Sequence, residues 1–538
     1  MKKTLLLAAA LLSSAAAMAQ WSGDRDIATT IFASDMNLYW NEPCLGADGT
    51  LWFLGDNPSS IEVEDLAIAN YAWRLQGIRP DGTRVFGDEG MLISNYDCTS
   101  WTVCGQLLYA NADSTITVVI RDCRNHGDHN TNYTAYRLRP DGSHVWDEDG
   151  VPVDNAMEDG NNAAMSITEL EDGSNVFAWL WSGDNTTNVS LQRITLEGEP
   201  QWDPFQSKLA GSFNDYPYLV RSTGNRFILV WGRTSSEYLT AMAYNADGTE
   251  AWSKRVTLYT GGFGSSPAWT KIKVKSSDDG GAIVTWYDDR DASNIEFPYI
   301  AYVKEDGQLG YVNAEGKADI RIGYEEWRHL QTDVIPDGQG TGFLAIFNQS
   351  DIGQSWYNAC IQHISLEGDL DYGETGKELM PIDDVHKSVY YISVQPGPDG
   401  TFAAFWMEHH ESYWDIECHM TIRRISDGEP VSEDTRDIRF VEGGRYRSDL
   451  KSFVDWEHEC WYTYWQDQGA TPDDKRNLDC VQRIGFDGSL PAIDNLAGIQ
   501  LPGAATYFDL QGHSLTTEPT SGIYIKRQGT RSQVINKL

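Results

Sequence analysis

The sequence predicts an all-β fold made of eight repeated units, and two series of turns together with a recurring aromatic residue support this prediction. Eight pairs of an acidic residue and glycine form a series with intervals of 50 to 61 residues. These acid-Gly turns begin at Asp81, Asp141, Glu197, Asp247, Asp306, Glu367, Asp427 and Asp487. A nearly constant period of this length is typical of repeat architectures, in which each unit is one supersecondary element.

A second series of turn residues precedes the first by about 30 residues in each unit. Its members are Asp48, Asp113, Asp172, Gly224, Asp279, Asp337, Asp399 and His458. An apolar, aromatic-rich run follows each of them, at 50–55, 115–121, 175–181, 226–232, 282–288, 342–348, 401–407 and 460–466. Such runs between turn formers predict β-strands. Each unit therefore reads as four strands, A to D, with a short A–B turn, a variable B–C loop and the acid-Gly C–D turn. Four-stranded units arranged radially form a β-propeller.

The recurring aromatic residue predicts how the ring closes. Six acid-Gly turns carry an aromatic residue five positions after the acid: Phe86, Trp146, Trp202, Trp252, Tyr311 and Tyr372. The eighth turn has Ala492 at this position, and Trp21 near the N-terminus can supply the missing ring. We therefore expect residues 21–30 to form the outer strand of the eighth blade. A seven-bladed ring with one stray unit is the alternative.

Both ends of the chain carry features that lie outside the repeats. Residues 1–19 have the pattern of a signal peptide, with Lys2 and Lys3, an apolar run and Ala17-Met18-Ala19 as the cleavage site. We expect a signal peptide at 1–19, a propeller at 20–494 and a small β unit at 495–538. No other segment has the length and apolarity of a membrane span. The predicted location is therefore secreted or on the cell surface.

All eight cysteines follow the signal peptide, as expected in an oxidising compartment. The hairpin register predicts two disulfides, Cys104 with Cys123 and Cys460 with Cys480. The spacing assigns no partners to the remaining four: Cys44, Cys98, Cys360 and Cys418. No Cys/His spacing indicates zinc.

The formal net charge of −38 limits the partners. A field of this sign repels phosphate backbones, so nucleic acid is excluded as the expected partner. It also disfavours polyanionic glycans unless arginine clusters or a cation intervene.

The last 35 or so residues contain a recognisable pattern. Tyr507 is followed by Asp509-Leu510-Gln511-Gly512, and the run 522–525 reads Gly-Ile-Tyr-Ile before Lys526 and Arg527. This segment resembles the C-terminal sorting domain of the Bacteroidetes type IX secretion system. The resemblance implies export by that machinery and says nothing of what the propeller binds.

The blades are similar to the Trp-x-Asp-x-Arg and Asp-Gly repeats of secreted proteins from the same phylum, as at 286–294. That likeness carries no activity. The Asp-box of sialidases separates its aspartate and glycine by one residue, whereas Gly248 directly follows Asp247 here. The units are therefore not Asp-boxes.

Ligand sites of propellers usually lie on the face formed by the B–C and D–A loops, because these loops vary without disturbing the strands. Three B–C loops are rich in charged residues. They contain Arg121, Asp122, Arg124, His126, Asp128 and His129 in unit two, Asp288, Asp289, Arg290 and Asp291 in unit five, and Glu408, His409, His410 and Glu411 in unit seven. The D–A connections add Asp215, Glu325, Glu326, Trp327, Arg328, His386, Arg445 and Arg447.

Each cluster has a functional and a structural interpretation. Asp289 and Asp291 alternate as calcium ligands do, but a full calcium loop would also have a central glycine and a distal glutamate. The unit-two histidines could hold a metal or act as a base, or belong to a solvated loop. Glu408 with His409 could supply a general acid and base, or mark a strand end against edge pairing. No cofactor is identified, and calcium is the metal that the Asp289 and Asp291 pattern would suit.

Two functions remain compatible with the sequence. The first is a secreted scaffold that binds an extracellular glycan or protein through the loop face. The second is a carbohydrate-active enzyme, a glycoside hydrolase or polysaccharide lyase, whose site is formed by several blades. A site for a neutral or cation-bearing glycan would need exposed aromatic rings beside carboxylates, and the candidates for the rings are Tyr216, Trp269, Trp327, Trp356 and Tyr446.

Overall fold

The computed structural model shows an all-β chain whose described residues form nine four-stranded antiparallel sheets. The structure describes residues 21–22, 25, 28–32, 39–58, 71–94, 106–122, 132–154, 161–183, 186–202, 209–210, 217–234, 237–260, 272–291, 295–313, 316–323, 327–380, 388–409, 415–468, 477–491, 506–508, 514–515, 522–528 and 531–537. The chain divides into two compact units, Met1–Leu490 and Pro491–Leu538.

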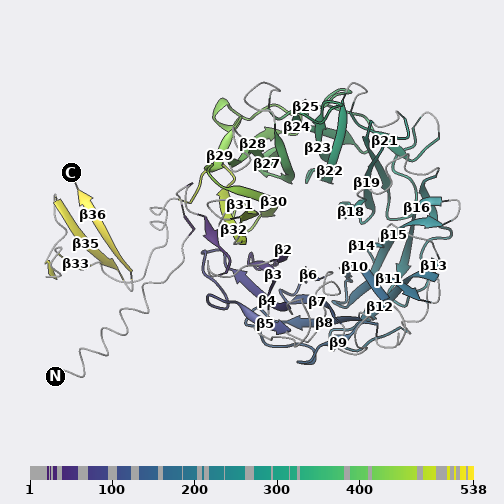
Figure 1. Ribbon diagram of the computed structural model, residues 1–538, viewed down its shortest axis with the longest axis horizontal. Helices are drawn as coiled ribbons and strands as arrows, with labels where there is room; N and C mark the ends of the chain where they lie inside the picture. Colours follow the sequence, from purple (N-terminus) through teal and green to yellow (C-terminus); the bar gives the residue numbers. More distant parts are fainter. Residues whose placement is uncertain are drawn as a thin grey trace. The chain divides into compact units, whose positions relative to one another are not determined.

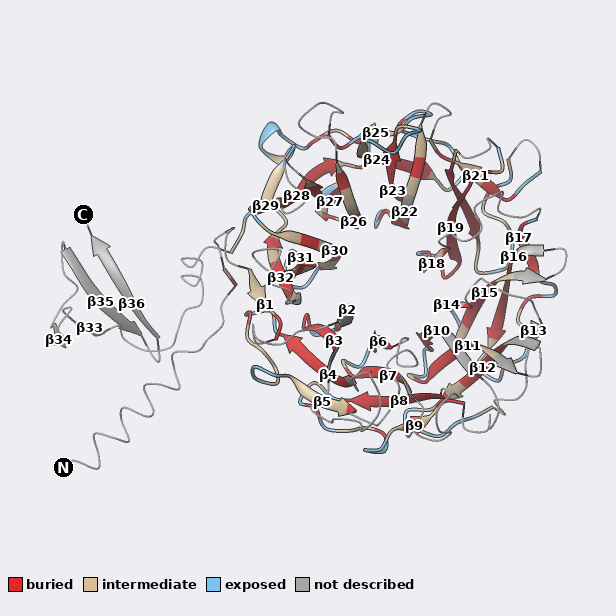
Figure 2. Ribbon diagram, in the orientation of Figure 1, coloured by how far each residue is buried: buried red, intermediate tan, exposed pale blue. Residues whose placement is uncertain are grey.

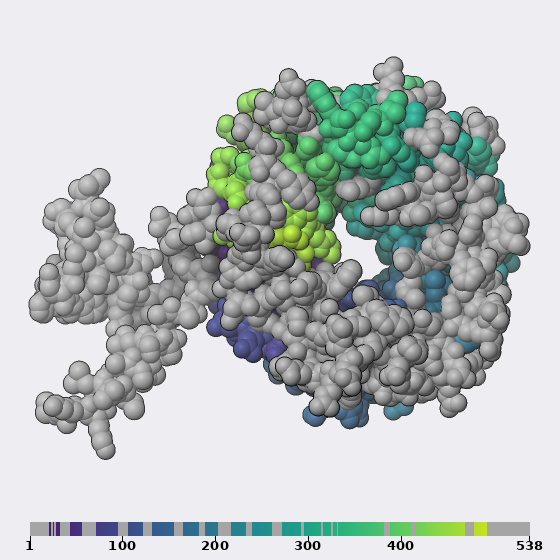
Figure 3. Space-filling view, viewed as in Figure 1, coloured from purple at the N-terminus to yellow at the C-terminus, as the bar shows by residue number. Residues whose placement is uncertain are grey.

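Eight sheets of the first unit stand around an open centre and form an eight-bladed β-propeller (Figures 1 and 3). Blades one to four are β2–β5 (Tyr39–Leu45, Leu51–Pro58, Tyr71–Ile78, Met91–Ser94), β6–β9 (Leu107–Ala110, Ile116–Asp122, Asn132–Leu138, Val151–Pro152), β10–β13 (Asn161–Glu169, Asn175–Gly183, Thr186–Ile194, Leu209–Ala210) and β14–β17 (Tyr218–Ser222, Arg226–Thr234, Glu237–Asn245, Val256–Tyr259). Blades five to eight are β18–β21 (Lys273–Ser276, Ala282–Asp288, Phe297–Val303, Asp319–Arg321), β22–β25 (Arg328–Pro336, Gly342–Ser350, Tyr357–Ser365, Lys377–Glu378), β26–β29 (Val389–Pro396, Thr401–His409, Ile416–Arg424, Ile438–Val441) and β30–β32 (Tyr446–Asp455, Cys460–Gln468, Asn477–Gly485) with β1 (Thr29–Thr30). In each blade the A strand lies nearest the centre and the D strand at the rim (Figures 1 and 2).

The apolar runs predicted as strands are the B strands of the blades. Strand β23 is buried at all nine positions, because neighbouring blades cover both of its faces. Figure 2 shows the same continuous burial along the middle strands of other blades. Burial on both faces explains why these runs are apolar throughout rather than alternating.

The acid-Gly turns are built to receive the aromatic residue of the preceding blade. Gly307 has φ +82°, and a Cβ on it would approach the Trp252 ring to 2.8 Å. Glycine therefore meets both a backbone and a packing requirement at this turn. The Trp252 indole Nε1 also donates to the carbonyl of Glu305, at 2.8 Å. The aromatic residue of one repeat thus anchors the turn of the next.

The N-terminal segment closes the ring as predicted, which makes the seven-bladed alternative wrong. Thr29 and Thr30 pair with Val481 and Cys480 of β32. The Trp21 side chain is buried, and its Nε1 donates to the carbonyl of Pro80 at 2.8 Å, just before the first acid-Gly turn. Trp21 therefore anchors the acid-Gly turn of blade one, as Trp252 anchors that of blade five. The strand itself is shorter than expected, since β1 covers only Thr29–Thr30.

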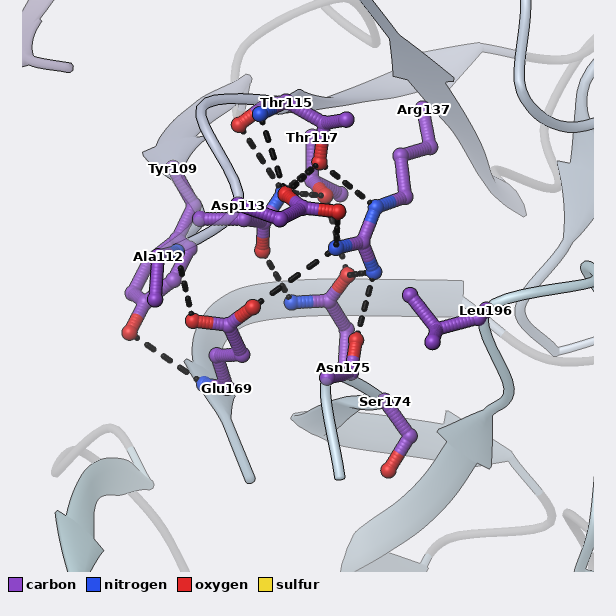
Figure 4. A network of polar contacts seen from close by, with 12 residues as sticks. Tyr109, Ala112, Asp113, Thr115, Thr117, Arg137, Glu169, Ser174, Asn175 and Leu196 are labelled. Carbon is purple, nitrogen blue, oxygen red and sulfur yellow. Dashed lines mark hydrogen bonds and ion pairs between the residues drawn. The ribbon is translucent and has the colours of Figure 1, made fainter. Parts of the chain in front are cut away.

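Polar contacts also join neighbouring blades, as Figure 4 shows around Arg137 of blade two. The buried Arg137 Nε donates to Thr115 at 2.7 Å, and its Nη1 donates to the carbonyl of Gly173 in blade three at 2.6 Å. Its Nη2 faces Asp113 at 3.1 Å and Glu169 of blade three at 3.6 Å. This network ties the A–B turns of two blades together.

The predicted disulfide between Cys460 and Cys480 is wrong, since the two thiols are not bonded to each other. Cys460 pairs in register with Gly485, and Cys480 pairs with Trp465. The two residues are thus five positions apart along the hairpin, roughly 16 Å at 3.3 Å per residue, which a disulfide does not span. Within the described part of the chain, Cys44, Cys360 and Cys418 form no disulfide either.

The second unit is a separate sheet in the order β34-β33-β35-β36. Its strands are Ser514–Leu515, Thr506–Phe508, Gly522–Gln528 and Arg531–Lys537. They pair with one another, and no described blade strand joins them. Among the described residues, no helix has the length and apolarity needed to cross a bilayer.

Candidate functional site

Part of the predicted site lies outside the described residues. These positions are Arg124, His126, Asp128, His129, Asp215, Tyr216, Trp269, Glu325, Glu326, His386, His410 and Glu411, and the same holds for Cys98, Cys104 and Cys123. Asp122 ends β7, and its side chain is not described. Arg121 precedes Asp122. Burial raises the pKa of the nearby Tyr133 to about 12, and the positive charge of Arg121 partly opposes this rise.

The B–C loop of blade five begins with a buried aspartate at the end of β19. Trp286 Nε1 donates to Asp288 Oδ2 at 2.9 Å, and the Arg290 backbone N–H donates to Asp288 Oδ1 at 3.1 Å. Burial raises the pKa of Asp288 to about 6, although the Arg290 charge and these hydrogen bonds oppose the rise. The Trp-x-Asp-x-Arg pattern is thus a local fold that fixes the position of Arg290.

Arg290 is held between two tyrosine rings from neighbouring blades. Its guanidinium carbon lies 4.1 Å from the ring centre of Tyr259 in blade four and 3.5 Å from that of Tyr299 in blade five. It forms ion pairs with Asp288, at 3.4 Å, and with Asp319 of β21. Cation–π contacts of this kind stabilise a guanidinium that has lost much of its water. We call Tyr259, Asp288, Arg290, Tyr299 and Asp319 the rim cluster.

Asp289 and Asp291, the predicted calcium ligands, face different partners. Asp289 is buried, and its charge contributes to the raised pKa of Arg328 in blade six. Asp291 is exposed, and its Oδ2 accepts a hydrogen bond from the Tyr299 hydroxyl at 2.9 Å. Within the described ranges, no group of three His, Cys, Asp or Glu side chains could hold a metal ion.

Arg328 begins β22 on the loop face and forms a bidentate ion pair with Glu296, which precedes β20 of blade five. The Arg328 Nε and Nη2 atoms each donate to one Glu296 oxygen at 2.6 Å. Fork-shaped pairs of this kind fix the orientation of both side chains. The pair therefore joins blades five and six beside half-buried Trp327.

Three rings from two blades meet at the same face. The Tyr357 and Tyr390 ring centres are 4.9 Å apart, and the Tyr390 ring lies 4.8 Å from the His409 imidazole. Tyr357 begins strand C of blade six, Tyr390 lies at the start of strand A of blade seven, and His409 ends strand B of blade seven. All three ends belong to the loop face, and each side chain is half-buried. We call these three residues the ring group.

The ring group and the Arg328 pair are neighbours. Burial raises the pKa of Tyr357, and the charge of Arg328 opposes that rise, so the guanidinium is close to the phenol. Trp356, next to Tyr357 in the chain, is half-buried as well. The structure thus gathers Asp289, Trp327, Arg328 and His409, all predicted site residues, over blades five to seven.

Glu408 does not belong to this surface. Its side chain is fully buried between blades six and seven, and its backbone pairs with that of Glu417. A carboxylate with no exposed surface does not contact a polymer at the loop face, so the prediction that Glu408 acts on substrate loses its geometric basis. Glu408 and His409 point to opposite faces of β27, and His409 is half-buried because it is the last residue of the strand.

Half-buried Arg445 contacts a buried network in blade eight. Its Nη1 lies 3.4 Å from Asp467 Oδ2, and Arg447 Nε donates to Asp467 Oδ1 at 2.7 Å. Trp465 Nε1 donates to the same Asp467 oxygen, at 3.0 Å. The Trp-x-Asp pattern of blade five thus recurs here, with one arginine just before strand A and one within it.

Sequence reasoning missed Tyr357, Tyr390 and Glu296. Each lies at or next to a strand end and follows no charged motif, so composition held no signal for them. The position at the loop-face end of a strand is the one pattern that could have indicated them.

Comparisons with known proteins returned matches by structure alone. No protein-family model matches the chain, and no curated protein does. Among solved structures, an ulvan lyase described as a new polysaccharide lyase family, PL25, is 9% identical with a TM-score of 0.41, covering 87% of this chain and 100% of the lyase. The polysaccharide lyase Uly1 is 10% identical with a TM-score of 0.37, covering 84% and 100%.

A third match is the Dos1 propeller, which is 6% identical with a TM-score of 0.39 and covers 85% of this chain and 95% of the match. Such values carry no argument about chemistry. The arrangement of the eight sheets, and not these matches, establishes the propeller.

Proposed function

We propose that this chain is a secreted or cell-surface protein whose propeller binds an extracellular glycan at the loop face over blades five to seven. The ring group carries this proposal, because Tyr357, Tyr390 and His409 come from two blades and meet at 4.8–4.9 Å on that face. Aromatic rings at a polar surface offer an apolar platform with a polar edge. The C–H groups on one side of a sugar ring can pack on such a platform.

The Arg328–Glu296 pair supplies polar groups beside the platform. Both side chains are fixed by two hydrogen bonds of 2.6 Å, so they meet a ligand without first losing rotamer freedom. Binding sites commonly combine aromatic walls with a few oriented polar groups. A sugar stacked on the rings would exchange hydroxyl hydrogen bonds with this pair.

The charge of the chain selects among glycans. With 79 acidic against 41 basic residues, the long-range field opposes polyanionic polymers. We therefore expect neutral or cation-bearing glycans to bind more tightly than sulfated or uronic acid polymers.

Affinity electrophoresis and calorimetry with a panel of neutral and acidic polysaccharides test this function. The Tyr390→Ala variant should weaken binding by about tenfold or more, since a stacked ring contributes on the order of 1–2 kcal/mol. Trp456→Ala is the matched control, because Trp456 is 50% exposed in the A–B turn of blade eight, on the opposite face. Equal losses in both variants, or binding of no polysaccharide, would refute the glycan proposal and favour a protein ligand.

A second function, glycoside hydrolase or polysaccharide lyase activity, has one observation in its favour. His409 and Tyr390 are adjacent, titratable and at the surface, with Arg328 nearby, and such groups can transfer protons to or from a bound sugar. The test is release of reducing ends or unsaturated products from the same panel. Loss of turnover in His409→Gln with retained binding would establish that the protein is an enzyme. If no polymer gave a product, the enzyme hypothesis would be refuted and the binding function would remain.

Both ends of the chain have features of export signals. We propose that residues 1–19 direct secretion and that 495–538 act as a type IX sorting domain, which is supported by its motif and by its separate sheet. Deleting 495–538 should leave the thermal unfolding of the propeller unchanged while surface retention is lost. Unaltered localisation of the truncated protein would refute the sorting role.

A further inference from the structure

His363, in β24 of blade six, meets a carboxylate at each of its two ring nitrogens. Its Nδ1 lies 2.6 Å from Asp371 Oδ2 in the C–D connection, and its Nε2 lies 3.1 Å from Asp337 Oδ2 in the A–B turn. His363 and Asp337 are buried, whereas the Asp371 side chain is 42% exposed. The ring centre of Tyr372 is 6.2 Å from that of the imidazole. The histidine therefore joins an inner carboxylate to an outer one.

His419, in β28 of blade seven, repeats this arrangement. Its Nδ1 lies 2.7 Å from Asp437 Oδ1, just before β29, and its Nε2 lies 3.2 Å from Glu417 Oε2. His419 and Glu417 are buried, whereas the Asp437 side chain is 36% exposed. The charge of Glu408 on β27 also acts on the ring, and Arg439 of β29 donates to the second Glu417 oxygen at 2.8 Å. Here too an inner and an outer carboxylate share one imidazole.

Both bridges need a doubly protonated ring. A neutral imidazole has one N–H and a charged one has two, whereas an ionised carboxylate only accepts. Burial alone would raise the pKa of Asp337, but hydrogen bonds from His363 and Thr341 outweigh it and lower this pKa to about 2. Burial alone would lower the pKa of each histidine. Hydrogen bonds to the two carboxylates outweigh that effect, raising the pKa of His419 to about 9 and that of His363 above its ordinary value of 6.5.

The outer carboxylate of blade six directly precedes the residue that anchors blade seven. Tyr372 follows Asp371, and its hydroxyl donates to the carbonyl of Ile425 in blade seven at 2.6 Å. The Tyr372 ring covers the acid-Gly turn of that blade, since a Cβ on Gly428 would approach the ring to 3.0 Å. In the five other repeats with an aromatic residue at this place, the residue before it is uncharged: Val85, Val145, Gln201, Ala251 and Gly310. A carboxylate bound to a histidine thus distinguishes this anchor.

The outer carboxylate of blade seven has the same place relative to the anchor of blade eight. Blade seven has Ser432 five residues after its acid, so the usual ring is missing from the sequence. Ile438 replaces it, since a Cβ on Gly488, in the acid-Gly turn of blade eight, would approach the Ile438 side chain to 2.5 Å. Asp437 directly precedes Ile438. Each histidine bridge therefore holds the segment that packs on the turn of the next blade.

We propose that His363 and His419 form a pH-sensitive lock on the anchors of blades seven and eight, closed while each imidazole carries two protons and open once it loses one. A neutral ring donates to a single carboxylate and turns a lone pair toward the other. Asp371 and Asp437 are the partners released, because they already lie at the surface and regain water more readily than the buried inner carboxylates do. Their release frees the two anchoring segments. The lock does not depend on ligand binding at the ring group.

The direction of the pH response follows from the raised pKa values. The stabilisation is fully present below the ordinary pKa of 6.5 and is lost as pH rises through the folded value, about 9 for His419. Local opening is then visible as faster amide exchange in 369–372 and 433–441. We expect exchange protection of both segments, corrected for the intrinsic effect of pH, to fall between about pH 6.5 and pH 9.5.

NMR titration of the imidazole resonances and hydrogen exchange followed by mass spectrometry, both on the full chain, test the lock. His363→Gln and His419→Gln assign the two resonances, and the His419 midpoint should lie near 9. Asp371→Asn should lower the His363 midpoint by about one pH unit or more, because it removes a facing negative charge. It should also make the protection of 369–372 independent of pH. Asp437→Asn should do the same for His419 and 433–441.

Asp369→Asn is the matched control, because Asp369 is exposed in the same C–D connection and its backbone N–H, not its carboxylate, is bound by Ser365. It should leave both midpoints and both exchange profiles unchanged. The two Asn variants change surface side chains, so they keep the test decisive if the histidine variants unfold. A midpoint at or below 6.5 for either ring, protection that does not fall at alkaline pH, or an unaltered fall in Asp371→Asn and Asp437→Asn would each overturn the lock.

Discussion

Arg137 in blade two and Arg290 in blade five are each paired with two carboxylates and each reach a neighbouring blade, but their hydrogen bonding differs. All three side-chain nitrogens of Arg137 have partners, as Figure 4 shows. Arg290 has partners at Nε and Nη2, whereas no described residue pairs with its Nη1. Arg137 is fully buried, whereas Arg290 lines a cavity.

This difference separates a fully satisfied polar network from a partly satisfied one. A buried network whose members all have partners stabilises one arrangement of two blades and offers nothing to a ligand. The Arg290 network leaves one donor and one acceptor without a described partner, and both atoms are buried, so it is the less fully satisfied of the two networks. Burial and charge alone would have placed both arginines in one class.

The largest effect should come from Arg137→Met. The substitution leaves buried Glu169 without the cation that it shares with exposed Asp113, so we expect a loss of about 3–5 kcal/mol in the free energy of unfolding. Urea denaturation followed by tryptophan fluorescence measures it. Arg139→Met, at an exposed position two residues away, should change the stability by less than about 0.5 kcal/mol. A small loss in Arg137→Met would show that the network is not structural.

Arg290→Met should lower the free energy of unfolding by about 1–3 kcal/mol, which is less than the loss expected in Arg137→Met. Asp288 has a pKa of about 6 and can take up a proton once the cation is gone, which reduces the penalty. The same urea titration compares the two variants directly. If Arg290→Met proved the more destabilising of the two, the rim cluster would be mainly structural.

The two networks should respond to pH in opposite directions. Burial raises the pKa of Asp288 to about 6, above its ordinary value of 3.8, so its contribution to stability is present at low pH and is lost as pH rises through about 6. Burial also raises the pKa of Asp113, but hydrogen bonds from Thr115 and the charge of Arg137 outweigh it and leave this pKa below its ordinary value. Its contribution is therefore present above the ordinary pKa and is lost as pH falls.

Unfolding free energies measure this contrast, with Asp288→Asn compared with the unmodified chain at about pH 4 and pH 7.5, and Asp113→Asn at about pH 2.5 and pH 5. Asp288→Asn should gain stability relative to the unmodified chain on going to the higher pH, and Asp113→Asn should lose it. The same sign in both variants would contradict the assignment of the two networks.

Arg321→Ala should have the smallest effect on folding. Its ion pair with Asp291 is 3.7 Å long and both side chains are at least one-third exposed, so the stability should change by less than about 1 kcal/mol. Thermal unfolding measures this change. A large fall in the melting temperature would show that the mouth of the cavity is part of the core.

The sequence alone predicted the ring and its closure. Turn chemistry and apolar runs are local properties, so Asp-Gly pairs and the aromatic residues after them indicate blades without knowledge of their packing. The place of Trp21 followed from one missing ring at Ala492. The pairing of Cys460 with Cys480 failed because the length of a B–C loop does not determine the register of the strands that it joins.

The candidate site was predicted only in part. The run from Asp288 to Asp291 and the surface position of His409 were visible as charged loop residues. The residues that they contact could not be predicted from the sequence. Asp319, which pairs with Arg290, lies 29 residues further along the chain, and Tyr259, which stacks on Arg290, belongs to another blade. Which strand ends meet depends on how the blades stack around the ring.

The sequence by itself determined the number of blades, the two faces and the charge that limits the ligand, because each follows from local turns, strand runs and composition. Only the tertiary structure decided that Glu408 is buried, that Tyr357, Tyr390 and His409 meet, and that Arg290 keeps a donor unmatched by any described residue. The physical reason is that strands alternate their side chains between two blade interfaces, so burial and contact are set by the neighbouring blade rather than by the residue's own repeat.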